Sequence, residues 1–339
     1  MRRLLNTLYV TNPDAYVCKK DDAVCVRVED EQLLSVPFQV LEGIVLFGHA
    51  RCSSALMSAS ARSGVAVVLL DEKGSFSARV EGAVSGNILL RRSQYAMAFD
   101  DEASLAIAKR FVVAKVYNAR VVVQRYARDY PESKEMLLPV VDSLLASRER
   151  ACNAGGMDEL RGVEGDAARS YFGAFDAMLR PRVEVRFGGR NRRPPKDPVN
   201  AALSFFYTLL AREVSTACSS VGLDPQQGYL HACRPGRMSL ALDMMEELRS
   251  PLADRFVLSL FNRGQLNRGD FEYSGEACYF KDAAMKRVLE AWQNKKKEQV
   301  VHPFLKERVS IGLLPFLQAQ LFSRYLRGDL DDYPAFLWR

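Results

Sequence analysis

The stretch SLAIAKRFVVAKVYNARVVVQRYARDY, residues 104–130, decides the fold class. Its apolar residues recur at intervals of three and four, which is the period of an amphipathic helix. Helical spacing continues through most of the chain after about Ser93. Breaks between helices are predicted at Pro131, Gly155–Gly156, Pro181, Pro194–Pro195 and Pro251. We therefore predict a mostly α-helical domain over residues 91–339.

The residues before this region carry a strand pattern instead. Short runs rich in valine and isoleucine alternate with polar or glycine-containing turns. The predicted strands are 7–10, 23–30, 43–48, 64–71 and 78–84, and SSALMSASARSG at 53–64 is predicted as a helix that ends at Gly64. The fold class that follows is α+β, with a small β-rich N-terminal domain at residues 1–90 before the larger helical domain.

Composition is that of a globular protein, with 48% hydrophobic and 26% charged residues. The seven cysteines form no CxxC pair that would indicate zinc or redox chemistry. Asn6 and Thr7 interrupt the short apolar patch near the N-terminus, and the apolar run at 65–70 is too short for a membrane helix. These features favour a cytoplasmic protein with reduced thiols.

Positive charge is concentrated in one segment. Between Arg180 and Lys196 seven residues are basic and one is acidic, which equals the net charge of +6 for the whole chain. Such a segment either lies on the solvated surface or binds the phosphates of a nucleic acid without reading its sequence. The predicted DNA contacts are Arg182, Arg186, Arg190, Arg192, Arg193, Lys196 and Arg237.

Glu164 lies on an apolar helical stripe that continues through Tyr171 and Phe175 to Leu179. A buried carboxylate is costly unless a cation or hydrogen-bond donors satisfy it. Two explanations remain open: an ion pair with Arg161 or Arg169, and a metal ion.

His231 and three acids follow in the segment 222–249. His231 stands between two turns, and Asp243, Glu246 and Glu247 share one side of a predicted helix that has Ser239 as its N-cap and stops at Ser250–Pro251. Taken singly, the histidine is structural more often than a ligand, and such acids usually form a solvated face. Together with Glu164 they provide the oxygen and imidazole donors that bind Mn²⁺ or Mg²⁺ for phosphodiester chemistry.

Four segments together resemble the CRISPR-associated adaptation integrase family, most closely its subtype I-C branch. They are RGVEGDAARSYF (161–172), GRNRRPPKDPVNAALSFFYTLL (189–210), GLDPQQGYLH (222–231) and GRMSLALDMMEELR (236–249). The β-rich N-terminal region and the segments HPFL and LRGDLDDYPAF near the C-terminus agree with it. The resemblance implies that Glu164, His231 and Glu246 bind the metal and that Asp243 and Glu247 support them, with Glu247 also the rival third ligand.

The resemblance also implies a function in CRISPR spacer acquisition and antiviral defence. The enzyme is expected to be a homodimeric, metal-dependent integrase and endonuclease that joins the 3′-hydroxyl ends of short double-stranded DNA fragments to CRISPR repeat DNA. The expected partner is a small ferredoxin-like companion protein, with two integrase dimers bridging one companion dimer. The β-rich N-terminal domain is the expected dimerisation region.

Two alternatives use the same residues. One is a stand-alone metal-dependent nuclease that cleaves branched DNA without joining strands. The other is a non-catalytic DNA-binding assembly protein, in which the acids and His231 are structural.

Overall fold

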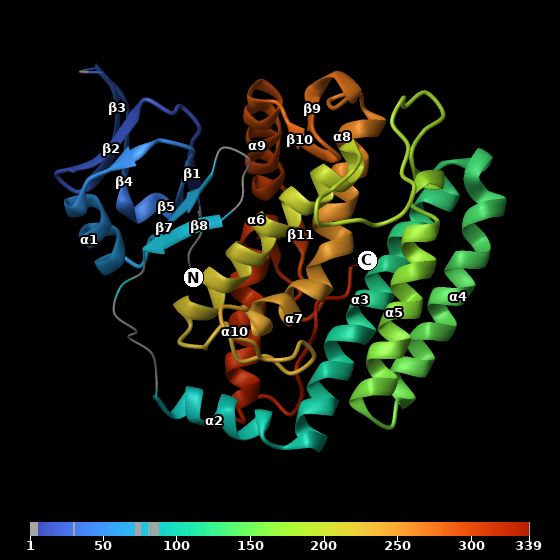
Figure 1. Cartoon of the computed structure of the whole chain (residues 1–339). Coiled ribbons are helices and arrows are strands. Elements are labelled where there is room, and N and C mark those ends of the chain that lie inside the picture. Colours follow the sequence, from blue (N-terminus) through green and yellow to red (C-terminus); the bar gives the residue numbers. More distant parts are fainter. Residues whose placement is uncertain (1–5, 30, 72–75, 81, 83–87, 339) are drawn as a thin grey trace. The chain divides into compact units, whose positions relative to one another are not determined.

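The chain forms two compact units in the computed structural model (Figure 1), which describes residues 6–29, 31–71, 76–80, 82 and 88–338. The first unit comprises Met1–Ser85, Met285–Glu298 and Ser310–Leu313, and the second comprises Gly86–Ala284, Gln299–Val309 and Leu314–Arg339. The first unit thus includes two segments that lie far beyond residue 90. Among the described residues, no helix combines the length and hydropathy that a bilayer crossing requires.

The first unit contains two four-stranded sheets. One has the order β1-β5-β7-β8 and the other β4-β3-β2-β6. The strands are β1 Asn6–Val10, β2 Ala15–Lys20, β3 Ala23–Val28, β4 Glu31–Pro37, β5 Leu41–Phe47, β6 Arg51–Cys52, β7 Ala66–Leu70 and β8 Phe76–Val80, and helix α1 is Ser54–Arg62. The five predicted strands correspond to β1, β3, β5, β7 and β8, although residues 81, 83 and 84 of the last lie outside the described residues.

Burial explains which strands the sequence revealed. β1, β5 and β7 pair in parallel, and Ile44 and Val67 are fully buried between their neighbours. Such strands read as continuous apolar runs. β2 and β4 were not predicted, because β2 ends in Lys19 and Lys20 and β4 is almost wholly exposed. Backbone pairing with β3, rather than apolar content, forms them.

The second unit is mainly helical, which confirms the predicted α+β class. Its helices are α2 Ile88–Ala98, α3 Asp101–Asp129, α4 Lys134–Asn153, α5 Met157–Gly173, α6 Pro198–Ser220, α7 Ser239–Leu248, α8 Arg255–Asn262 and α10 Leu314–Leu326, while α9 Asp282–Lys297 continues from this unit into the first. Short strand pairs were not predicted; they are β9 Phe271–Ser274 with β10 Ala277–Phe280, and β11 Gln299–Val301 with β12 Arg308–Ser310.

Helix α3 is the axis of the second unit, and α4, α5 and α7 all pack against it (Figure 1). Asp100 caps its N-terminus by accepting hydrogen bonds from the N–H groups of Glu102 and Ala103, each at 3.0 Å. Phe111 is fully buried in the middle of the helix, where its ring contacts those of Phe322 and Tyr333. The helix predicted from residues 104–130 is therefore confirmed.

Both ends of α7 differ from the prediction. Ser239 is the first residue of the helix rather than its cap, and its hydroxyl donates to the carbonyl of Ala232 at 3.1 Å. The predicted stop at Ser250–Pro251 is wrong, because Arg249–Asp254 form a π-helical turn that leads directly into α8. Proline lacks the N–H that an α-helical ladder needs, and the wider turn accommodates it.

The apolar helical stripe that contains Glu164 is shorter than predicted, since α5 ends at Gly173.

Replacing Phe111 by alanine should lower the free energy of unfolding by about 3–5 kcal/mol, because a fully buried ring would leave a cavity. Phe99→Ala is the matched control, since the ring of Phe99 is 88% exposed. Its effect should stay within about 0.5 kcal/mol. Urea denaturation followed by circular dichroism measures both, and equal losses would contradict the placement of Phe111.

Candidate metal and phosphodiester site

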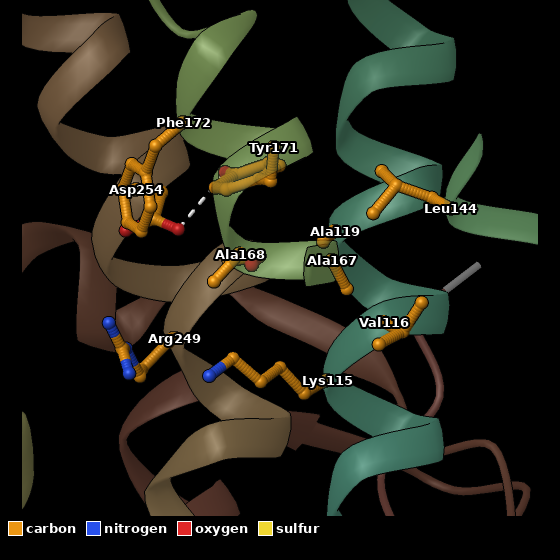
Figure 2. Close-up of a pocket in the computed structure, with 11 residues that line it drawn as sticks. Lys115, Val116, Ala119, Leu144, Ala167, Ala168, Tyr171, Phe172, Arg249 and Asp254 are labelled. Carbon is orange, nitrogen blue, oxygen red and sulfur yellow. Dashed lines mark hydrogen bonds between the residues drawn. The ribbon is translucent and has the colours of Figure 1, made fainter. Parts of the chain in front are cut away.

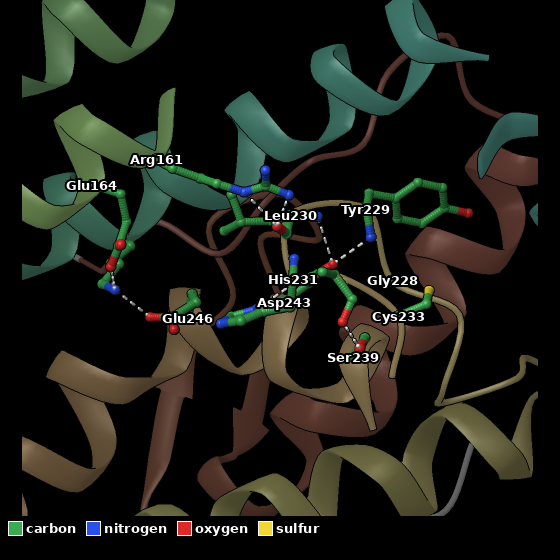
Figure 3. A network of polar contacts seen from close by, with 12 residues as sticks. Arg161, Glu164, Gly228, Tyr229, Leu230, His231, Cys233, Ser239, Asp243 and Glu246 are labelled. Atoms are coloured by element: carbon green, nitrogen blue, oxygen red, sulfur yellow. Dashed lines mark hydrogen bonds and ion pairs between the residues drawn. The ribbon is translucent and has the colours of Figure 1, made fainter. Parts of the chain in front are cut away.

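Two carboxylates from different helices meet at one ammonium group (Figure 3). The Nζ of Lys115 on α3 forms ion pairs with Oε1 of Glu164 on α5 and with Oε2 of Glu246 on α7, the latter at 2.8 Å. The side chains of Lys115 and Glu246 are 13% and 4% exposed, whereas that of Glu164 is 28% exposed. The acids therefore share a largely buried cation and keep one side open to solvent at Glu164.

Arg249 provides a second cation for Glu246. Its Nη1 lies 2.7 Å and 3.0 Å from the two carboxylate oxygens of Glu246, one turn earlier on the same helical path. Burial opposes ionisation of Glu246, but the charges of Arg249 and then Lys115 outweigh it and lower the pKa of this carboxyl group to about 2. Glu246 is thus an anion over the whole physiological pH range.

His231 is oriented by a buried aspartate. Asp243, fully buried on α7, accepts hydrogen bonds from the N–H groups of Tyr229, Leu230 and His231 at 2.6, 3.0 and 3.0 Å. Its Oδ1 also lies 2.6 Å from Nδ1 of the His231 ring. A carboxylate anion only accepts, so Nδ1 carries the proton and the lone pair is on Nε2. When the ring is protonated instead, the charge of His231 lowers the pKa of Glu246, which agrees with the two side chains being neighbours.

Gly228 allows this loop to approach α7. A Cβ atom at this position would lie 2.7 Å from Oδ2 of Asp243 and 2.7 Å from the carbonyl carbon of Ser239. Arg161 holds the loop from the other side, because its Nη2 donates to the carbonyl of Leu230 at 3.0 Å. The backbone around His231 is therefore fixed before any ligand is present.

A polar network lies behind the acids, at a small cavity of about 20 Å³ (Figure 2). Asp254 accepts hydrogen bonds from Tyr171, at 3.0 Å, and from Tyr207. The guanidinium of Arg249 lies 4.3 Å from the centre of the Tyr207 ring. Burial raises the pKa of Asp254, although Arg249 and the two tyrosine hydroxyls act in the opposite direction. This network therefore positions Arg249, and Arg249 in turn positions the carboxylate of Glu246.

The structure brings Glu164, His231, Asp243 and Glu246 into one region. Asp243, Glu246 and Glu247 are all buried, so the alternative of a solvated acidic face is wrong. The cation beside Glu164 is Lys115, whereas Arg161 and Arg169 pair with Asp158 and Asp166.

Glu247 points to a different part of the unit. Its carboxylate accepts hydrogen bonds from the Tyr333 hydroxyl at 2.6 Å, the Phe336 N–H at 2.6 Å and Nε2 of Gln318 at 2.9 Å. A one-residue step on a helix turns the side chain by roughly 100°, which separates it from Glu246. The structure therefore does not support Glu247 as the rival ligand, and it assigns this residue to the anchoring of the C-terminal segment.

The ligand atoms of Glu164, His231 and Glu246 are of the kinds that bind a divalent cation, but the three side chains do not already surround a single binding point. Within the described part of the chain, no three histidine, cysteine or acidic side chains are grouped closely enough to bind a metal ion. The ammonium of Lys115 stands between Glu164 and Glu246. Two carboxylates and an imidazole nitrogen are ligands that Mn²⁺ and Mg²⁺ accept, and the position of Lys115 shows that this space favours positive charge.

Buried apolar residues at every second position anchor the basic segment that follows α5. Val183, Val185 and Phe187 are buried, whereas Arg182, just before them, and Arg186, between Val185 and Phe187, are exposed. The Phe187 ring packs 4.9 Å from that of Phe175. Arg182 and Arg186 each donate to a backbone carbonyl, of Asn262 at 2.8 Å and Val183 at 2.9 Å, respectively.

The prediction that Arg190 contacts DNA from the surface is not supported. Its guanidinium turns inward and donates to Oδ1 of Asn200 at 2.7 Å and to the hydroxyl of Ser204 at 3.1 Å. It also lies 5.2 Å from the centre of the Tyr207 ring, and burial lowers the pKa of Arg190 to about 10. Arg190 therefore attaches the segment to α6.

The other predicted DNA contacts remain on the surface or near it. Arg192 and Arg193 are exposed, and Lys196 is exposed while paired with Glu276 at 2.6 Å. Arg237 is half-buried in the loop between His231 and α7.

Lys115 and Arg249 were not predicted as site residues. Lys115 interrupts the apolar run FVVAKVY at 111–117, and Arg249 follows Glu246 at the i+3 spacing of a helical ion pair. Both patterns are visible in the sequence. The acids that pair with Lys115, however, are distant in sequence, and Arg249 stands at the end of a helix that was predicted to stop at Ser250–Pro251.

Comparison with known proteins confirms the family resemblance. The family model described as CRISPR associated protein Cas1 matches residues 8–294. A relative from Chlorobaculum tepidum, CRISPR-associated endonuclease Cas1 1, is 45% identical over 343 residues and covers 100% of both chains. The subtype I-C assignment stays a prediction.

Two solved structures share the fold. A chain of a Cas6-RT-Cas1–Cas2 complex has a TM-score of 0.82 and 22% identity, over 98% of this chain and 36% of that one. A casposase bound to integration product has a TM-score of 0.82 and 23% identity, over 99% of this chain and 94% of that one.

Stability should depend on pH through Glu247. Burial raises the pKa of this group from 4.5 to about 7, so the folded state binds its proton more tightly than the unfolded state does. The resulting stabilisation is complete below pH 4.5 and is lost as pH rises through about 7, by on the order of 3 kcal/mol. Glu247→Gln removes the titration, so its unfolding free energy relative to wild type should increase across this range.

Urea denaturation at several pH values measures this difference. Glu149→Gln, an exposed substitution on α4, is the control and should follow the wild-type profile. A constant difference between Glu247→Gln and wild type would show that the pKa of Glu247 is the same in the folded and unfolded states.

Proposed function

The chain belongs to the Cas1 family of CRISPR-associated proteins, and from this premise we propose that it joins 3′-hydroxyl ends of short DNA fragments to CRISPR repeat DNA by metal-dependent transesterification. The observation that carries the proposal is the convergence of Glu164 and Glu246 on one cation, with His231 beside them. Its relatives are named endonucleases, and the casposase of similar fold is described as bound to an integration product.

In this proposal Glu164, His231 and Glu246 hold Mn²⁺ or Mg²⁺, which polarises a phosphate oxygen and lowers the pKa of the attacking hydroxyl. The remaining roles belong to the protein itself. Asp243 keeps the lone pair of His231 on Nε2. Arg249 fixes the carboxylate of Glu246, and Tyr207 supports Arg249 from behind.

We further propose that the enzyme acts in the cytoplasm as a homodimer with double-stranded DNA fragments and repeat DNA. The small ferredoxin-like companion expected from the resemblance is consistent with the Cas1–Cas2 complex of similar fold. Exposed Arg192 and Arg193 are well placed to contact the DNA backbone.

Strand transfer should require the three ligands and a 3′-hydroxyl. Glu164→Ala, His231→Ala and Glu246→Ala should each lower Mn²⁺-dependent joining of a labelled DNA fragment to repeat DNA by about 100-fold or more. A fragment ending in a 3′-deoxynucleotide should not be joined. Joining is measured on denaturing gels.

The outcomes separate the alternatives. Full activity in all three variants would leave a DNA-binding assembly protein with structural acids. Metal-dependent cleavage of branched DNA without joining would indicate a stand-alone nuclease.

Lys115 should compete with the metal. Lys115→Met removes the ammonium that neutralises both acids, so it should lower the Mn²⁺ dissociation constant by about tenfold, equivalent to about 1.4 kcal/mol. In chelator the same variant should melt at a lower temperature than wild type, because two carboxylates lose their shared counterion. Isothermal titration calorimetry and thermal denaturation measure these effects. Lys134→Met, an exposed control on α4, should change neither, and unaltered Mn²⁺ affinity in Lys115→Met would refute the competition.

Surface and buried arginines should act differently on DNA binding. Arg192→Gln/Arg193→Gln should weaken affinity for unrelated sequences alike and reduce the slope of log affinity against log salt by about 1–2. Arg190→Gln should instead lower thermal stability, because it removes the hydrogen bonds of the guanidinium to Asn200 and Ser204. Fluorescence anisotropy at several salt concentrations tests this, and an unchanged slope in the double variant would contradict the DNA contact.

A further inference from the structure

A second polar site of the helical unit lies where α3 ends, beside α8 and the chain that follows α5. It is a hollow of about 280 Å³, lined by residues from 125–130, by Arg180 and by residues from 255–263. Five arginines line it: Arg125, Arg128, Arg180, Arg255 and Arg263. We call it the arginine hollow.

Among the described residues that line the arginine hollow, one carries a carboxylate. Asp129 pairs with Arg128 at 2.8 Å, and both side chains are more than half exposed. The lining therefore has a formal charge of +4, compared with +6 for the whole chain. A concave surface of one sign concentrates the electrostatic field and attracts ions of the opposite sign.

The wall at Arg180 is built from buried groups. Asn262, 3% exposed, accepts a hydrogen bond from the backbone N–H of Arg180 at 2.8 Å and donates from Nδ2 to the carbonyl of Met178 at 2.9 Å. This contact fixes the backbone from which the Arg180 guanidinium enters the hollow. Asn262 also lowers the pKa of Tyr126, although burial, the larger effect, raises it to about 12, so this wall carries no phenolate anion.

Aromatic rings contact three of the guanidinium groups. Arg180 lies 4.9 Å from the centre of the Tyr130 ring and donates to its hydroxyl at 3.2 Å. Arg255 and Arg125 lie 4.9 Å and 5.9 Å from the centre of the Trp338 ring. Such contacts orient a guanidinium without neutralising it. Among the described residues, Nε of Arg180 is also a buried donor without a hydrogen-bond partner.

We propose that the arginine hollow binds the phosphate groups of a nucleotide. Guanidinium groups donate paired hydrogen bonds that match phosphate oxygens. The volume is near the lower end of small-molecule sites, which suits a few phosphate groups and excludes a duplex. The phosphates come either from a DNA strand that leaves the duplex or from a free nucleotide or polyphosphate. The site shares no residue with the Glu164, His231 and Glu246 group, so it does not depend on the proposed metal.

Inorganic pyrophosphate is the probe that tests the site. Isothermal titration of the full-length protein in chelator should show saturable binding. Arg128→Gln/Arg263→Gln should weaken it by about tenfold or more, which corresponds to about 1.4 kcal/mol. Both side chains are exposed, so the fold should be retained, and a thermal denaturation curve checks this.

Arg150→Gln/Arg169→Gln is the matched control. It also removes two exposed arginines, and both lie beside Asp166 on the α4 and α5 surface. Its pyrophosphate affinity should remain within about twofold of wild type, or about 0.4 kcal/mol. Absence of saturable binding in wild type, or equal losses in the two double variants, would overturn the proposal.

A fluorescent single-stranded oligonucleotide in the same buffer identifies the source of the phosphate. If pyrophosphate displaces it and Arg128→Gln/Arg263→Gln weakens both ligands, the hollow takes a DNA strand. If pyrophosphate binds at the hollow without displacing DNA, the ligand is a free anion. Chelator prevents integration, so neither result depends on the proposed catalytic activity.

Discussion

The ammonium of Lys115 is the contact on which the candidate site depends. It joins α3 to α5 and α7 by pairing with Glu164 and Glu246, two acids that would otherwise repel each other in a place with little water. Removing one partner of a buried ion pair is strongly destabilising, while the intact pair adds little net stability. Lys115 therefore determines position more than stability, because it keeps the two acids close together. In the proposed function a divalent cation would take its place.

The adjacent acids Glu246 and Glu247 on α7 have different surroundings and different roles. Glu246 meets Lys115 and Arg249, so its pKa falls to about 2, whereas Glu247 meets three neutral donors, so burial dominates and its pKa rises to about 7. The same backbone step thus creates one permanent anion for the site and one proton-sensitive anchor for the C-terminal segment. Asn118 on α3 strengthens that anchor through the carbonyl of Phe336 and the N–H of Trp338.

Sequence patterns predicted the helices and strands that are determined by their own residues. The helix around 104–130 follows from apolar periodicity and the strands β5 and β7 from continuous apolar runs, and the resemblance pointed to Glu164, His231 and Glu246 by their motifs. Two kinds of feature escaped. Proline at 251 indicated a stop, but a π-helical turn absorbs it. Arg190 stands among exposed arginines in sequence, yet Asn200 and Ser204 draw it inward. Both outcomes depend on tertiary contacts that no local pattern contains.

The turn at 249–254 links the two charged sites of the helical unit. Arg249 at its start supports Glu246, and Asp254 at its end receives the hydroxyls of Tyr171 and Tyr207, while the next residue, Arg255, lines the arginine hollow. The acids on one side are held by cations of the chain itself, whereas three guanidinium groups on the other contact aromatic rings, which do not themselves neutralise a charge. Because a continuous helical path connects them, the site that favours a cation and the site that favours an anion keep a fixed spacing, and a DNA strand that occupies the hollow would present its phosphates at a defined distance from Glu246.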